Sequence, residues 1–132
     1  MKQKTPDKGY YFIIKLHIYP FDVIVSVDEP DEVIGKRLKN WGHNEEECAS
    51  AMNPPEAFKG YYVLFPSNRS LIRFKTQKNW RGDMVGVVVH EAFYLTSMIL
   101  DRIGMKFKLN VSDEAYAYLV EYLTVEIIKK LK

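Results

Sequence analysis

The chain has 132 residues, of which 47% are hydrophobic and 27% charged, a size and composition typical of a folded domain rather than a disordered chain. Its formal net charge of +2 is too small to indicate a nucleic-acid partner by itself. The single Cys48 excludes an internal disulfide and a cysteine-only zinc site, and it fits a reducing compartment.

The sequence predicts no targeting segment and no membrane span. The start, Met1 to Lys8, is polar and basic, and Lys15 interrupts the apolar run that follows it. No run of residues approaches the roughly 20 apolar residues that cross a membrane. We therefore expect a cytoplasmic protein with no membrane partner.

Two extended segments are expected near the N-terminus. Tyr10 to Tyr19 is rich in β-branched and aromatic residues, which predicts a strand. Its alternate apolar residues would share one face: Phe12, Ile14, Leu16 and Ile18. Pro20 breaks this strand, and Val23 to Val27 resumes extended structure. The two segments form either a hairpin or one bent strand, and the sequence leaves both open.

A short helix is expected next. The acidic residues and the proline between Asp28 and Asp31 are typical of a helix start. Apolar residues then recur at helical spacing as far as Trp41, and Gly42 ends the helix. His43 to Met52 is an acidic connection with one or two helical turns. His43 and Cys48 within it, five residues apart and without further ligands, are only a weak indication of a metal site.

Two short strands, Tyr61 to Phe65 and Ser70 to Phe74, are joined by turn residues and predict a β-hairpin. No acidic residue occurs between Lys59 and Arg81. Basic and aromatic side chains in this region could track a phosphate backbone or meet an acidic protein partner: Arg69, Arg73, Lys75, Lys78, Trp80 and Arg81. The alternative is a solvated hairpin face with core aromatic residues behind it.

The most specific motif lies on a helix predicted from near Met84 to Gly104. His90-Glu91 is the first half of the zinc-peptidase motif H-E-x-x-H, in which two His one turn apart bind zinc and the Glu activates a bound water. Tyr94 stands where the motif has its second His. Wide apolar coverage predicts a buried helix, and burying His90 and Glu91 is costly unless they are paired or bind a metal.

A second long helix is predicted from Ser112 to Leu131, with Glu114 in its first turn. If this helix packs antiparallel to the first one, Glu114 could approach His90 and complete a metal site. His90 and Tyr94, four residues apart, share one helix face, and Glu91 lies about 100° around the axis. The alternative is a structural polar pair of His90 and Glu91 without a metal.

The last third of the chain, from Val87 to Leu131, resembles a group of small bacteriophage proteins classed as zincin-like peptidases. The shared residues include His90 and Glu91, the helix end at Ile99, Leu100 and Gly104, and the start of the second helix at Ser112, Asp113, Glu114, Ala115 and Tyr116. The chain departs from the group at Tyr94. The resemblance implies a helix pair with the ancestry of a zinc site.

The resemblance also implies a ligand set of His90, Glu114 and Tyr94, with Glu91 as the general base on a zinc-bound water. A phenol has a reference pKa of about 10 and is a rare zinc ligand, so such a site would be weaker than one with two His. Alternatively, Tyr94 fills the former metal pocket, no zinc is bound, and the protein is a retired enzyme kept for binding or assembly.

The sequence therefore predicts one α+β domain over residues 1–132, with a small antiparallel β-sheet packed on a zincin-like pair of long helices and one shorter helix. The first functional hypothesis is an inactive metallopeptidase-like phage protein, acting in the virion or as an accessory binding factor, with a protein partner or self-assembly. The second is an active zinc-dependent peptidase using His90, Glu91 and Glu114 on a peptide. The third is a nucleic-acid-binding module using residues 59–81. The resemblance implies a location in the infected host cytoplasm or in the virion.

Overall fold

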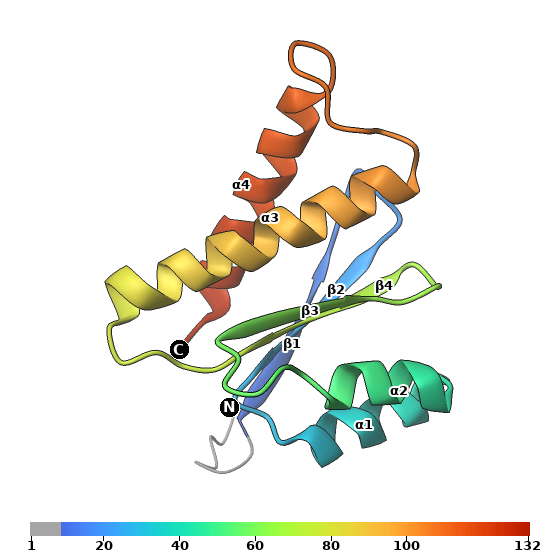
Figure 1. The fold of residues 1–132 in the computed structure, drawn as a ribbon, viewed down its shortest axis with the longest axis vertical. Coiled ribbons are helices and arrows are strands. Elements are labelled where there is room, and N and C mark those ends of the chain that lie inside the picture. The colour runs from blue at the N-terminus through green and yellow to red at the C-terminus, as the bar shows by residue number, and fades with distance from the viewer. Residues whose placement is uncertain (1–8) are drawn as a thin grey trace. The chain divides into compact units, whose positions relative to one another are not determined.

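The computed structural model describes residues 9–132, with the side chains of Trp80 and Arg81 left out. Sheet and helices together make an α+β protein, as the sequence predicted (Figure 1). We expected a single domain, and the chain groups into two compact units, Met1–Thr76 and Gln77–Lys132.

The first unit holds a four-stranded sheet of β1 (Tyr10–Lys15), β2 (Asp22–Val27), β3 (Gly60–Leu64) and β4 (Arg69–Phe74), in the order β1-β2-β4-β3. The first two segments form an antiparallel hairpin, which resolves the choice left open by the sequence. The predicted hairpin of β3 and β4 is confirmed. The central pair β2 and β4 is parallel, so the expectation of a purely antiparallel sheet was wrong. A parallel pair needs a long crossover, and the helical segment between β2 and β3 supplies it.

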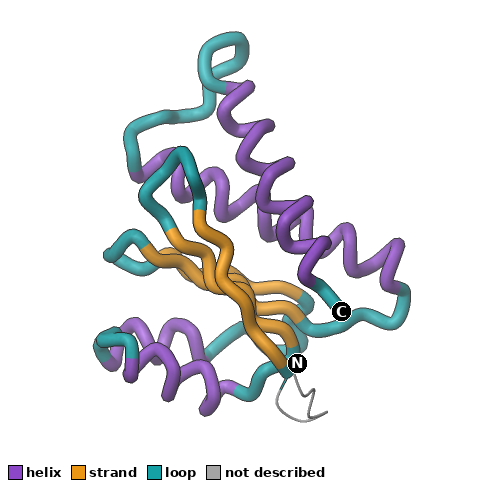
Figure 2. Tube along the Cα trace, turned by 180° about the vertical axis from the view of Figure 1, so that it is seen from behind, coloured by secondary structure: helices purple, strands orange, loops and turns teal. Residues whose placement is uncertain are grey.

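Two short helices form that crossover, α1 (Asp31–Asn40) and α2 (Glu45–Met52), where we expected one. They lie together on one side of the sheet (Figure 2). The acidic connection is thus a helix of its own, begun by a capping box at Asn44. Gly42 takes a φ of +89° between the helices, a conformation that suits glycine.

The core of the first unit lies between these helices and the sheet. It contains six buried apolar residues: Ile24, Ile34, Leu38, Ala51, Phe65 and Leu71. Each of the larger side chains stabilises the fold by about 1.5–3 kcal/mol when fully buried. The two helices also pack closely on each other, because a Cβ at Gly35 would lie 2.2 Å from the Sδ of Met52. The segment between α1 and α2 lies where β2 and β4 begin, since His43 contacts Arg69, whereas Ala51 near the end of α2 contacts Arg73 near the end of β4.

The second unit is a helical hairpin of α3 (Val85–Arg102) and α4 (Asp113–Lys130), preceded by a π-helical turn at Trp80–Met84. The two helices run in roughly opposite directions and cross (Figure 1). Each helix has a buried stripe at helical spacing, formed by Val88, Ala92, Leu95 and Ile99 on α3 and by Tyr116, Leu119, Leu123 and Ile127 on α4. Gly104, with a φ of +84°, ends α3 as predicted.

The segment Gly82–Arg102 is long and apolar enough, by length and composition alone, to cross a membrane, which we did not expect from the sequence. The core helix of a folded protein passes the same test, and 44% of the most apolar 18-residue window is buried here. The buried stripe accounts for part of the apolar composition, and exposed residues such as Val89, Phe93 and Met98 contribute the rest.

Candidate functional site

The residues of the broken zinc motif lie in the first half of α3. Glu91 is buried, whereas His90 and Tyr94 are exposed, with Tyr94 at 42%. The expected burial of His90 was therefore wrong, because the buried arc of α3 leaves His90 outside it. The rings of His90 and Tyr94 lie 4.9 Å apart between centroids, and Phe93 meets Tyr94 edge-on at 5.6 Å. Together they form an exposed aromatic cluster, His90–Phe93–Tyr94.

Glu91 is the one member of the motif inside the protein. Its side chain is 4% exposed, and its Oε2 atom has no hydrogen-bond partner among the described residues. Burial raises the pKa of this carboxyl, and the nearby His90 counteracts part of that rise. An unpaired carboxyl in such surroundings favours its neutral form, since burial penalises the charge. Glu91 is thus a buried carboxyl of raised pKa next to an exposed His in the sequence.

Glu114 lies at the other end of the helical hairpin. In the same turn of α4, the Tyr116 hydroxyl donates to the Met105 carbonyl at 2.7 Å, and its ring packs edge-on against Phe107. The start of α4 therefore contacts the link that follows α3. His90 precedes the last residue of α3 by 12 positions, or about 18 Å along the helix axis. An antiparallel hairpin pairs the start of one helix with the end of the other, so the structure does not bring Glu114 to His90.

Within residues 9–132, no three His, Cys, Asp or Glu side chains are grouped so that they could hold a metal ion. Of the predicted ligand set, His90 and Tyr94 adjoin each other on α3, whereas Glu114 lies in the first turn of α4, and a zinc ion on these three residues stays a prediction. His43 and Cys48, the weaker metal candidates, also lack further ligands. The Cys48 thiol lies 3.9 Å from the backbone carbonyl of His43 rather than beside its ring.

The basic residues predicted to bind nucleic acid or a partner are distributed over both units. Arg73 is buried and donates to the carbonyl oxygens of Ala51 at 2.9 Å and Glu29 at 3.1 Å. It also pairs with Asp31 at 2.8 Å, so it anchors the loops around α1 and α2 and is not available to a ligand. Arg73 is buried because it lies on the face of the sheet that α1 and α2 cover.

The remaining basic residues have different surroundings. Lys75 is exposed, with its amine 4.8 Å from the Phe58 ring centre, and Lys78 is exposed in the second unit. The side chains of Trp80 and Arg81 lie outside the described residues. Arg69 points to His43 instead of forming part of a basic face. Of the predicted basic set, Lys75 and Lys78 are thus exposed, Arg69 is half-buried and Arg73 is buried.

The sequence reasoning missed a chain of three polar side chains, Glu47–His43–Arg69. The capping box at the start of α2 fixes Glu47, whose backbone N–H donates to the Asn44 side chain at 2.8 Å while its Oε1 accepts from the Asn44 N–H at 3.1 Å. Its Oε2 lies 3.2 Å from His43 Nδ1, and His43 Nε2 lies 3.0 Å from Arg69 Nη1. The hydrogen bond from the Asn44 N–H is the largest cause that lowers the pKa of Glu47, and the hydrogen bond with His43 lowers it further.

These contacts define the state of the His43 ring. A guanidinium can only donate, so Nε2 must accept with its lone pair. Nδ1 then carries the ring proton, and this N–H donates a hydrogen bond to the Glu47 carboxylate. The ring is buried against Phe65, with centroids 4.5 Å apart, and it fixes the direction of Arg69.

The sequence contains a local signal for only one half of the Glu47–His43–Arg69 chain of side chains. The Asn44 and Glu47 pair is a readable capping box, and His43 stands four residues before Glu47, one helical turn away. Arg69 is 26 positions from His43, and only the fold of the sheet brings the two together.

Comparisons of the chain with protein-family models, with curated proteins and with solved structures find no match.

Proposed function

We propose that this protein is a catalytically inactive binding or assembly component that keeps a zincin-like helix pair without its metal site. The observation that carries this proposal is the separation of Glu114 from His90 in the second unit. A zincin of the kind that the sequence resembles needs both residues on one metal ion. Here the start of α4 contacts Met105 and Phe107 instead.

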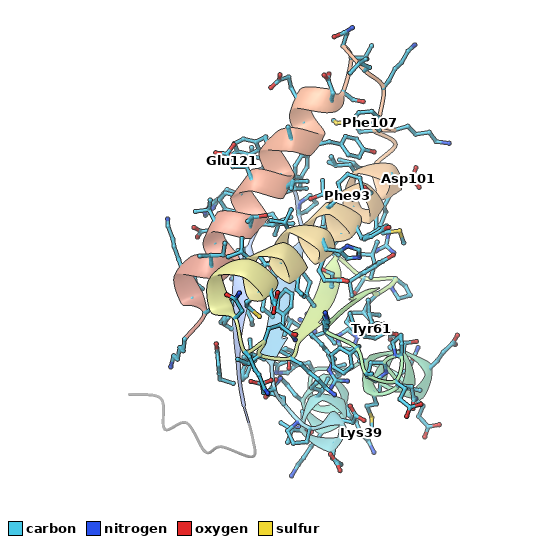
Figure 3. The ribbon with its side chains drawn as sticks, turned by 60° about the vertical axis from the view of Figure 1, so that its left-hand side comes forward. Lys39, Tyr61, Phe93, Asp101, Phe107 and Glu121 are labelled. Carbon is cyan, nitrogen blue, oxygen red and sulfur yellow. The ribbon has the colours of Figure 1, made fainter. Side chains whose placement is uncertain are left out.

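A binding role is supported by the apolar side chains that the second unit exposes. On α3 these include Met98 and Phe93, which is 51% exposed, and in the link they include Phe107 and Val111. Figure 3 labels Phe93 and Phe107. Large exposed apolar side chains that gather in one part of a protein are typical of a surface that meets another protein. The occupant of this surface is a protein partner or a second copy of the chain.

The resemblance to bacteriophage zincin-like proteins extends the proposal to place and context. It supports a role in the virion or as an accessory factor in the infected host cell. Loss of the second His at Tyr94 agrees with such a role, since the aromatic ring contributes contact area where a ligand would have bound zinc.

A zinc-dependent peptidase is the second candidate function, and buried Glu91 is the observation that favours it. A carboxyl of raised pKa beside an imidazole is a common feature of acid–base sites. That candidate needs two further ligands besides His90, and of the predicted ligands Tyr94 adjoins it, with the ring centroids 4.9 Å apart.

The binding surface can be tested with a charge introduced into the exposed aromatic cluster. We expect Phe93→Glu to leave the thermal stability nearly unchanged, since the side chain is exposed, and to abolish self-association in sedimentation experiments or capture of virion proteins. Glu121→Lys, a change on the outer side of α4 (Figure 3), is the matched control. Equal association by wild type and Phe93→Glu would contradict a role for this surface.

A further inference from the structure

A cavity in the first unit lies beside the Glu47–His43–Arg69 chain. It has a volume of about 450 Å³ and lies between the start of β2, the end of α1 and the turn that joins β3 to β4. Pockets of this size accommodate small ligands. Its lining includes Asp22, Trp41, His43 and Arg69.

Arg69 is held in this lining by two contacts. Its Nη1 donates to His43 Nε2 at 3.0 Å, and its guanidinium carbon lies 5.3 Å from the Trp41 ring centre. The other N–H donors of its fork have no partner among the described residues. A guanidinium that is always charged and already oriented can bind a carboxylate through two parallel hydrogen bonds without losing much side-chain entropy.

Asp22 supplies an opposite charge at the neighbouring position. Asp22 on β2 and Arg69 on β4 are partners in the register of the parallel pair, so their side chains lie on the same face of the sheet. Nevertheless no ion pair joins them, and the Asp22 carboxylate accepts no hydrogen bond from the described residues. His43 explains the separation, because it draws the guanidinium towards the helices.

The arrangement of charges narrows the class of ligand. A phosphate dianion would find one guanidinium and be repelled by Asp22. A metal ion would find one unoccupied carboxylate, since Glu47 already accepts from His43 and Asn44, and would be repelled by Arg69. A molecule with one carboxylate and one ammonium group satisfies both charges.

We propose that this cavity binds a small zwitterion of the amino-acid type, with its carboxylate on Arg69, its ammonium group on Asp22 and its side group against Trp41. The site is separate from the exposed aromatic cluster on α3, and it does not depend on the function proposed above. His43 is a positioning residue in it, since it holds Arg69 and is itself held by Glu47.

Trp41 in the wall of the cavity makes binding directly measurable. The chain has two tryptophans, so a Trp80→Phe background leaves Trp41 as the only one. Its fluorescence would be titrated with each natural amino acid, with γ-aminobutyrate, and with acetate, ethylamine and inorganic phosphate as partial probes. We expect a saturable change with at least one amino acid, and affinities at least tenfold weaker for each partial probe.

Two variants that remove one charge each test the roles of the charges. In the same background, Asp22→Asn and Arg69→Gln should each weaken the binding at least tenfold, while the matched changes Asp101→Asn and Arg102→Gln in the second unit leave it unchanged. Circular dichroism would check that each variant is folded, and the wild-type titration stands independently of them. The proposal is overturned if no amino acid saturates the signal at about 10 mM, a dissociation constant too weak for a specific site. Binding of acetate or phosphate as tight as that of any amino acid would overturn it equally.

Discussion

Two regions of this protein place a histidine near a glutamate, one on α3 and one in the first unit. The sequence indicated the first region and not the second. On α3, His90-Glu91 is part of a well-known motif, yet the structure leaves His90 exposed and Glu114 far along the hairpin. In the first unit, His43 has no motif around it, yet the fold places it between Glu47 and Arg69. A local pattern thus predicted a metal site, whereas the fold connected His43 with Glu47 and Arg69, which no motif indicated.

Among the substitutions that sharpen this comparison, replacement of the buried Arg73 should have the largest effect on stability. Arg73→Ala should lower the free energy of unfolding by about 3 kcal/mol, because it leaves the carbonyls of Ala51 and Glu29 and the Asp31 carboxylate without their donor. Chemical denaturation measures the loss. Lys75→Ala, in the same basic stretch but exposed, should change the stability by no more than about 0.5 kcal/mol. Similar losses for both would mean that Arg73 does not anchor the loops.

The same substitution in the two histidine regions compares them directly. His43→Ala should cost about 2 kcal/mol, since it removes the ring contact with Phe65 and leaves Glu47 and Arg69 without the group between them. His90→Ala should cost less than about 0.5 kcal/mol, because the side chain is exposed. Thermal unfolding of the pair at neutral pH measures both. A larger loss for His90→Ala would reverse the comparison.

The capping box tests whether the support of His43 begins at Asn44. Asn44→Ala should lower the stability by about 1 kcal/mol, the usual value of a helix N-cap. It should raise the pKa of Glu47 only slightly, because the backbone N–H of residue 44, the largest cause of the lowered pKa, is retained and only the side-chain cap on the Glu47 N–H is lost. NMR titration of the Glu47 side chain would measure this change, and Asn53→Ala at the other end of α2 is the control.

Glu91 should give the smallest effect, and it depends on pH. Its folded-state pKa is raised above the ordinary 4.5 by burial, so the folded protein binds more protons than the unfolded chain above that pH. Wild-type stability should therefore fall as the pH rises from about 4.5 through the raised pKa, and Glu91→Gln should lack this decline. Denaturation curves at several pH values measure it. Parallel curves for the two proteins would show that Glu91 is not buried without a partner.

Local signals in the sequence predicted most of the elements. The hairpin of β3 and β4, the first helix and the two long helices follow from alternation, turn residues and caps, and Gly104 ends α3 where a left-handed residue was expected. The hairpin of β1 and β2 was one of two alternatives that the sequence left open. The parallel pairing of β2 and β4 was not predictable in this way. It depends on how the crossover of α1 and α2 returns the chain to the sheet, which no local pattern encodes.

The candidate sites show the same limit. Spacing correctly put His90 and Tyr94 on one face of α3, where their rings are in contact. It could not give the exposure of His90 and Tyr94, nor the level at which α4 packs beside α3. Arg73 looked like part of a basic surface because its charge is visible in the sequence, whereas its buried partners at Glu29 and Ala51 are distant along the chain.

The most direct test of the central claim is the zinc content of the purified protein. Elemental analysis would be made after zinc is supplied and excess is removed, for wild type, His90→Ala and Tyr94→His. The proposed inactive binding protein predicts no bound zinc in wild type or in His90→Ala, whatever Tyr94→His acquires. About one zinc per wild-type chain that is lost in His90→Ala would contradict it, and would make His90 a ligand of a working metal site.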